Sequence, residues 1–123
     1  MGLLKGLRVL IVEDEGAVAL LIEDMLEDLG CLVVGSISRL AQAKDVSCLI
    51  QADVAILDVN LAGELVFPVA EILRDRAIPF IFSTGYGARG LHGEYALCPV
   101  LRKPYSQSDL EQTIDAALKA FNP

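Results

Sequence analysis

Five polar residues follow apolar runs in the sequence, and their side chains could bind a cation and accept a phosphoryl group. Glu13 and Asp14 follow the first such run, and Asp58 follows a later one. Thr84 and Lys103 follow two further runs. Three carboxylates held close together repel one another unless a cation neutralises them, and Mg²⁺ prefers such hard oxygen ligands. The acids therefore predict a Mg²⁺ site, with a solvated acidic rim as the alternative.

Asp58 differs from the other two acids because it directly follows a wholly apolar run, residues 54–57. A carboxylate held rigidly in this way can act as a nucleophile. Phosphoryl transfer to a carboxylate also needs a cation and a hydrogen-bond donor for the charge on the equatorial oxygens. Taken singly, Lys103 is typical of a surface lysine and Thr84 of a strand end. Together with the acids, they indicate phosphoryl transfer to Asp58.

Five apolar runs alternate with segments of helical periodicity along the chain. We expect strands at residues 9–12, 32–34, 54–57, 80–82 and 100–101. The alternation predicts an α/β fold of the flavodoxin-like (βα)5 type, a three-layer sandwich with a parallel sheet of order 2-1-3-4-5. Because the carboxyl ends of parallel strands meet at one edge, the five polar residues should lie together there.

The segments between the strands differ in helical strength. We expect helices at residues 18–29, 38–49, 66–73 and 108–121. The first should bury an apolar stripe that includes Leu21 and Ile22, and the last should begin with a capping box formed by Ser108 and Glu111. Between residues 85 and 98 there are four glycines, each of which costs a helix about 1 kcal/mol relative to alanine. The fourth helix is therefore predicted to be weak or mobile.

Length and composition limit the classes of function. With 123 residues, of which 54% are hydrophobic, the chain is expected to form one domain, residues 1–123. The net charge of −7 argues against binding to nucleic acid or to an anionic membrane. The sequence has no signal-peptide pattern and no apolar run near the roughly 20 residues that span a bilayer, so we expect a cytoplasmic protein. The three cysteines fit neither a disulfide framework nor a zinc site and are expected to be buried thiols.

As a set, these residues resemble the response-regulator receiver domains of bacterial two-component signalling, over residues 7–121. The resemblance implies that Glu13, Asp14 and Asp58 hold Mg²⁺. It also implies that Asn60 offers its backbone carbonyl to the metal. Asp58 would be the residue that accepts a phosphoryl group from the phosphohistidine of a sensor histidine kinase.

The resemblance extends to the fourth and fifth strands. It implies that Thr84 is the hydroxyl that switches position and that Lys103 pairs with the phosphate, with a cis bond before Pro104. The sequence Phe-Ser-Thr-Gly-Tyr at residues 82–86 resembles a receiver subgroup with the motif Phe-Xaa-Thr-Gly-Tyr, common in alphaproteobacteria. Members of that subgroup are often paired with kinases of the HWE class, which implies such a partner here.

The sequence also departs from the receiver pattern after Asp58. Most receivers carry a Met-Pro pair and then a glycine in this loop, where this chain has Leu61, Ala62 and Val66. The loop must therefore turn differently, and Gly63 is the residue at which we expect the turn.

The resulting expectation is a stand-alone receiver without an effector domain, which switches a protein-binding face for an unknown protein target. It would catalyse only its own phosphorylation and dephosphorylation. The alternatives are a phosphate sink, a pseudo-receiver that only binds proteins, and a phosphatase of the haloacid dehalogenase type. That phosphatase would need a second acid where Asn60 stands. The G-x-G-x-x-G spelling of residues 85–90 also allows a dinucleotide enzyme, but it follows the fourth strand and not the first.

Overall fold

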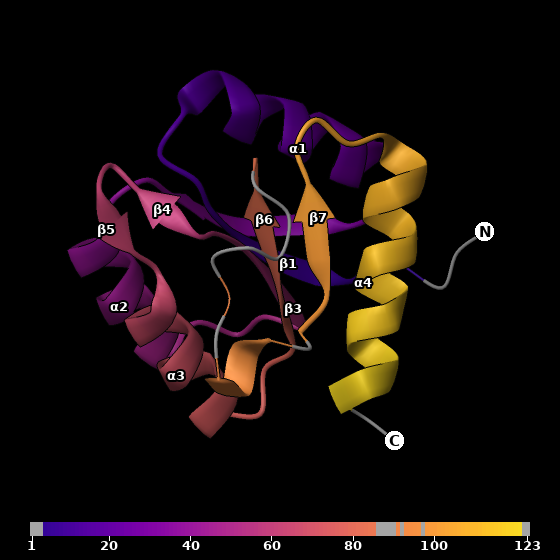
Figure 1. Cartoon of the computed structure of the whole chain (residues 1–123). Coiled ribbons are helices and arrows are strands. Elements are labelled where there is room, and N and C mark those ends of the chain that lie inside the picture. The colour runs from indigo at the N-terminus through magenta and orange to yellow at the C-terminus, as the bar shows by residue number, and fades with distance from the viewer. Residues whose placement is uncertain (1–3, 86–90, 92, 97, 122–123) are drawn as a thin grey trace.

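The computed structural model describes residues 4–85, 91, 93–96 and 98–121. Its main feature is a five-stranded parallel sheet with the strand order β2-β1-β3-β6-β7 (Figure 1). The strands are β1 (Arg8–Val12), β2 (Leu32–Ile37), β3 (Val54–Asp58), β6 (Phe80–Thr84) and β7 (Val100–Arg102). β6 and β7 are the fourth and fifth strands of this sheet in chain order, so the strand order is the predicted 2-1-3-4-5. The predicted flavodoxin-like fold is confirmed.

Helices cover both faces of the sheet (Figure 1). They are α1 (Gly16–Asp28), α2 (Leu40–Leu49), α3 (Phe67–Asp75) and α4 (Gln107–Phe121). Residues of the central strands alternate between two cores: Ala55 and Leu57 pack with α2 and α3, whereas Val54 and Ile56 pack with α1 and α4. Strands buried on both faces explain why the sequence runs are apolar without polar alternation.

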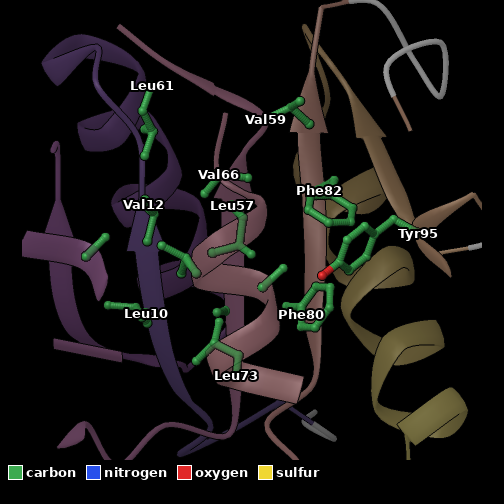
Figure 2. Close-up of a cluster of buried hydrophobic side chains, with 14 of the residues drawn as sticks. Leu10, Val12, Leu57, Val59, Leu61, Val66, Leu73, Phe80, Phe82 and Tyr95 are labelled. Carbon is green, nitrogen blue, oxygen red and sulfur yellow. The ribbon is translucent and has the colours of Figure 1, made fainter. Parts of the chain in front are cut away.

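Aromatic side chains fill the core on the α2–α3 side. Phe80 and Phe82 of β6 meet edge to face at a centroid distance of 5.4 Å, and Phe82 lies 5.6 Å from Tyr95 (Figure 2). Tyr95 ends a single 3-10 turn, η2 (Gly93–Tyr95). Among the described residues between β6 and β7, this turn stands in place of an α-helix, as expected from the glycines. The rest of that segment, residues 86–90, 92 and 97, lies outside the described part.

The register of the parallel strands brings their carboxyl ends into line. Val12 pairs with Leu57, which places Glu13 beside Asp58. Asp58 pairs in turn with Ser83, and Thr84 pairs with Arg102, the residue before Lys103. The sheet therefore gathers all five polar strand-end residues at one edge, as predicted.

A short hairpin follows β3, outside the main sheet. It consists of β4 (Asn60–Leu61) and β5 (Glu64–Leu65), which pair antiparallel. Ala62 and Gly63 connect them with φ angles of 51° and 91°. Two successive positive φ angles are those of a type I′ turn, whose twist matches a two-residue hairpin. The expected turn at Gly63 is confirmed, and the hairpin is an addition that the sequence did not predict.

Three local expectations are corrected by the structure. The capping box of α4 is formed by Ser106 and Asp109, and not by Ser108 and Glu111. The Ser106 hydroxyl accepts a hydrogen bond from the Asp109 N–H at 3.1 Å, and the Asp109 carboxylate accepts one from the Ser106 N–H at 3.0 Å. The cap lies two residues earlier than expected, and the helix begins at Gln107, because this reciprocal pair satisfies its first donors.

The other two corrections concern burial. Leu21 is 54% exposed, because the buried face of α1 runs through Ala19, Ile22 and Leu26. Of the three cysteines, only Cys31 is buried, whereas Cys98 is half-buried and Cys48 is exposed. In the described part of the chain, no helix combines the length and hydropathy that a membrane crossing requires.

Candidate functional site

Three acids meet at the carboxyl edge of the sheet. Asp58 is the last residue of β3, and Glu13 and Asp14 directly follow β1. Each contributes a carboxylate oxygen to a group in which all three oxygens lie within 4.8 Å of one another. Glu13 and Asp58 are buried, whereas Asp14 is half-buried. The three acids that the sequence predicts as metal ligands are thus adjacent in the fold.

Lys103 reaches the same site from the end of β7, across 90 residues of sequence. Its ammonium nitrogen Nζ donates a hydrogen bond to Glu13 Oε1 at 2.9 Å and lies 3.5 Å from Asp58 Oδ1. The Lys103 backbone N–H donates to the Thr84 carbonyl at 2.9 Å, which fixes the lysine beside β6. The peptide bond from Lys103 to Pro104 is cis, as expected. The Lys103 ammonium group therefore forms ion pairs with two of the three acids, Glu13 and Asp58.

The electrostatics of the site raise the pKa of Asp58 to about 7. Burial is the largest cause, and the charge of Glu13 adds to it, while Lys103 opposes both. Burial alone would also raise the pKa of Asp14, but hydrogen bonds with Asp58 and from the Ala62 N–H lower it. The pKa of Lys103 is raised: burial lowers it, and the bond to Glu13 and the charge of Asp58 outweigh that effect.

These residues fit a divalent cation by their chemistry. Three carboxylates and one ammonium leave two negative charges when all are ionised (−3 + 1 = −2). The raised pKa of Asp58 indicates that Lys103 alone does not offset the burial of this carboxylate and the charge of Glu13. The donor atoms are hard oxygens, which Mg²⁺ prefers over soft ligands. Glu13, Asp14 and Asp58 would hold the ion.

Asp14 and Asp58 line a cleft of about 460 Å³ at this edge of the sheet, and Glu13 is buried beside them. The other lining residues are Glu15, Val59, Asn60, Leu65, Thr84, Gly85 and Lys103. Thr84 is the last residue of β6 and is 7% exposed. The cleft thus brings the hydroxyl, the ammonium group and the nucleophile candidate together, in a space large enough for a phosphoryl group.

Asn60 lies at the cleft, in β4. Its side-chain oxygen Oδ1 accepts a hydrogen bond from the Gly63 N–H at 2.7 Å, which stabilises the hairpin turn. The role of its backbone carbonyl as a metal ligand stays a prediction. Of the residues in the G-x-G-x-x-G stretch, 86–90 lie outside the described part, and so does Tyr86 of the Phe-Ser-Thr-Gly-Tyr motif.

Sequence reasoning missed two features of the cleft. The Ala62 N–H donates to Asp14 Oδ2 at 3.0 Å, so the hairpin turn contacts one of the acids. Leu65, on the second strand of the hairpin, lines the cleft. The sequence signal for the turn was Gly63, which readily adopts a positive φ, whereas Ala62 is not a residue that a type I′ turn favours.

The burial of the Asp58 carboxylate, together with the charge of Glu13, predicts a pH-dependent gain in stability for Asp58→Asn. At pH 8, without metal, the free energy of unfolding should rise by up to about 4 kcal/mol, and at pH 4 it should hardly change. The folded-state pKa of about 7 lies above the unfolded value of about 3.9, so the wild type loses stability as pH rises between them. Asparagine has no proton to lose. Urea denaturation in a chelator at both pH values measures the effect, and an equal shift at both would contradict it.

Comparisons with known proteins agree with this geometry. The family model described as "Response regulator receiver domain" matches residues 9–115. The transcriptional regulatory protein PdtaR of Mycobacterium tuberculosis is 30% identical over 118 residues, which cover 93% of this chain and 58% of that protein. The chain thus spans little more than half the length of this curated relative.

Solved structures give the same result. SdrG from Sphingomonas melonis Fr1 superposes with a TM-score of 0.82 at 39% identity, covering 96% of this chain and 99% of that one. The receiver domain of the sensor histidine kinase PA1611 from Pseudomonas aeruginosa PAO1 superposes with a TM-score of 0.74 at 25% identity, covering 93% and 98% of the two chains. That structure has a magnesium ion coordinated in its active-site cleft.

Proposed function

Because the chain belongs to the response regulator receiver domain family of two-component signalling, we propose that Asp58 accepts a phosphoryl group from a histidine kinase in a Mg²⁺-dependent reaction. The observation that carries the proposal is the cleft in which Asp14, Asp58, Lys103 and Thr84 meet, with Glu13 in contact with Lys103 beside it. The magnesium ion in the cleft of the PA1611 receiver domain supports the choice of metal.

In the proposed reaction, a carboxylate oxygen of Asp58 attacks the phosphorus of the kinase phosphohistidine. The bond between phosphorus and the imidazole nitrogen breaks, and the imidazole leaves with the electron pair. Asp58 ends a strand whose five residues are all buried, so the nucleophile is held rigidly at the sheet edge. When bound, Mg²⁺ would supply positive charge that offsets the carboxylates and the phosphoryl oxygens.

Lys103 and Thr84 would stabilise the product. The Lys103 ammonium lies 3.5 Å from Asp58 Oδ1, within reach of an oxygen of a phosphoryl group on that carboxylate. Thr84, in the same cleft, would donate its hydroxyl hydrogen to another phosphoryl oxygen. Thr84 ends β6 and Lys103 follows β7, and both strands lie on the same side of β3. Movement of either residue toward the phosphoryl group would therefore change the surface beside β6 and β7.

The proposed partners are proteins. The sequence resemblance supports a histidine kinase, of the HWE class, as the donor, and the net charge of −7 argues against nucleic acid as a direct target. We propose a cytoplasmic regulator that changes a protein-binding face on phosphorylation. A phosphate sink would use the same site but no binding face.

Incubation with a small phosphodonor such as acetyl phosphate tests the proposal without the kinase. Intact-mass spectrometry should show one added phosphoryl group in the presence of Mg²⁺ and none after the metal is removed with a chelator. A generic phosphomonoester assay should show no turnover, which separates a receiver from a phosphatase. Failure of the wild type to gain a phosphoryl group with Mg²⁺ present would refute the proposal.

A further inference from the structure

The β4–β5 hairpin forms one wall of the cleft and is held at both ends. At its base, the Val66 N–H donates to the Val59 carbonyl at 2.9 Å, and the Leu61 side chain is buried in the α2–α3 core. At its tip, the Ala62 N–H donates to Asp14 Oδ2 at 3.0 Å. Because both its base and its tip are held, the hairpin has a defined position relative to the acids.

Within the hairpin, Asn60 and Leu65 are directly opposite each other on the two strands, and both line the cleft. The Asn60 side-chain oxygen is engaged by the Gly63 N–H. Leu65 is 53% exposed, although it is a large apolar residue. A single exposed leucine is ordinary on a protein surface, but this one borders the cleft that contains the Asp58 carboxylate.

We propose that Leu65 shields the phosphoryl group on Asp58 from water and thereby prolongs its lifetime. The inference rests on the proposed function. Loss of the phosphoryl group is hydrolysis: a water oxygen attacks phosphorus, the bond from phosphorus to the Asp58 oxygen breaks, and the carboxylate leaves with the electron pair. The water loses its proton to solvent, and inorganic phosphate is released. An apolar side chain at the cleft reduces the access of that water.

The remaining cleft residues explain why Leu65 should matter in this way. Most are charged or polar, namely Asp14, Glu15, Asp58, Asn60, Thr84 and Lys103. Such groups hold water by hydrogen bonds and do not exclude it. The other large apolar side chain at the cleft, Val59, is 9% exposed and packs into the core. Leu65 is thus the exposed apolar group among the described cleft residues.

Substitution of Leu65 tests the proposal through the decay of the phosphorylated protein. Wild type, Leu65→Ala and Leu65→Met are phosphorylated with acetyl phosphate and Mg²⁺, the donor is removed, and the phosphorylated fraction is followed by intact mass. Leu65→Ala should decay at least about threefold faster, which is about 0.7 kcal/mol in the barrier. Leu65→Met, which keeps the apolar bulk, should decay at close to the wild-type rate.

Leu49→Ala is the matched control, because Leu49 is 81% exposed at the end of α2 and does not line the cleft. Its phosphoprotein should decay like the wild type. If Leu65→Ala is phosphorylated but decays no faster than wild type, the shielding role is wrong and the proposed function stands. Equal acceleration by Leu49→Ala would also overturn shielding. If the wild type takes up no phosphoryl group, the proposed function itself fails.

Discussion

Replacement of Asp58 by alanine is expected to abolish phosphorylation by a small phosphodonor, under conditions in which the wild type gains one phosphoryl group. Among the three clustered acids, Asp58 is the one held at the end of a wholly buried strand, with Lys103 3.5 Å from its oxygen. Glu13 accepts the shorter bond from Lys103, and Asp14 accepts one from the hairpin. Neither is placed to take over as the nucleophile. Intact mass in the presence of Mg²⁺ measures the loss directly.

Asp45→Ala is a suitable control for this experiment. Asp45 is exposed on α2 and lies outside the cleft, so its variant should gain the phosphoryl group as the wild type does. Circular dichroism should show that both variants are folded. Uptake of a phosphoryl group by folded Asp58→Ala would place the acceptor elsewhere and contradict the assignment.

The second large effect is expected from the double substitution Glu13→Gln and Asp14→Asn. It keeps the shapes of the side chains but removes two of the three negative charges that the acids present. Mg²⁺ is a hard ion held by few protein ligands, so its affinity depends on those charges. We expect the dissociation constant to rise roughly 100-fold, about 2.7 kcal/mol, as measured by isothermal titration calorimetry.

Glu15→Gln separates direct binding from a general effect of charge. Glu15 lines the same cleft, but its side chain is exposed and lies outside the group of three acids. The Glu15→Gln variant should lose far less Mg²⁺ affinity than the double variant. The same Mg²⁺ titration curve for the wild type and the double variant would show that Glu13 and Asp14 are not ligands.

The sheet and its polar edge are predictable from the sequence for one physical reason. Strands buried on both faces appear as uninterrupted apolar runs, so the first polar residue after each run marks where the strand emerges. Parallel strands then place those residues at the same edge, which is why Glu13, Asp58, Thr84 and Lys103 can be grouped by their positions in the sequence. That reasoning needs no detail of side-chain packing.

The features that were missed depend on contacts between distant or weakly patterned residues. Each strand of the β4–β5 hairpin has two residues, too few for a periodic signal. Its fixed position depends on the bond from the Ala62 N–H to Asp14, 48 residues away. The place of Leu65 at the cleft follows from that position. The capping box was misplaced because Ser106 and Ser108 both precede an acid at the right spacing, and the backbone decides between them.

Identification of the modified residue is the decisive measurement for phosphoryl transfer to Asp58. The wild type, phosphorylated in the presence of Mg²⁺, is treated with borohydride, which reduces an aspartyl phosphate to homoserine, and is then digested for peptide mass spectrometry. We expect homoserine at position 58 and unchanged residues at positions 13 and 14. Reduction at any other acid, or a phosphoryl group that resists borohydride because it is not an acyl phosphate, would contradict the assignment of Asp58 as the acceptor.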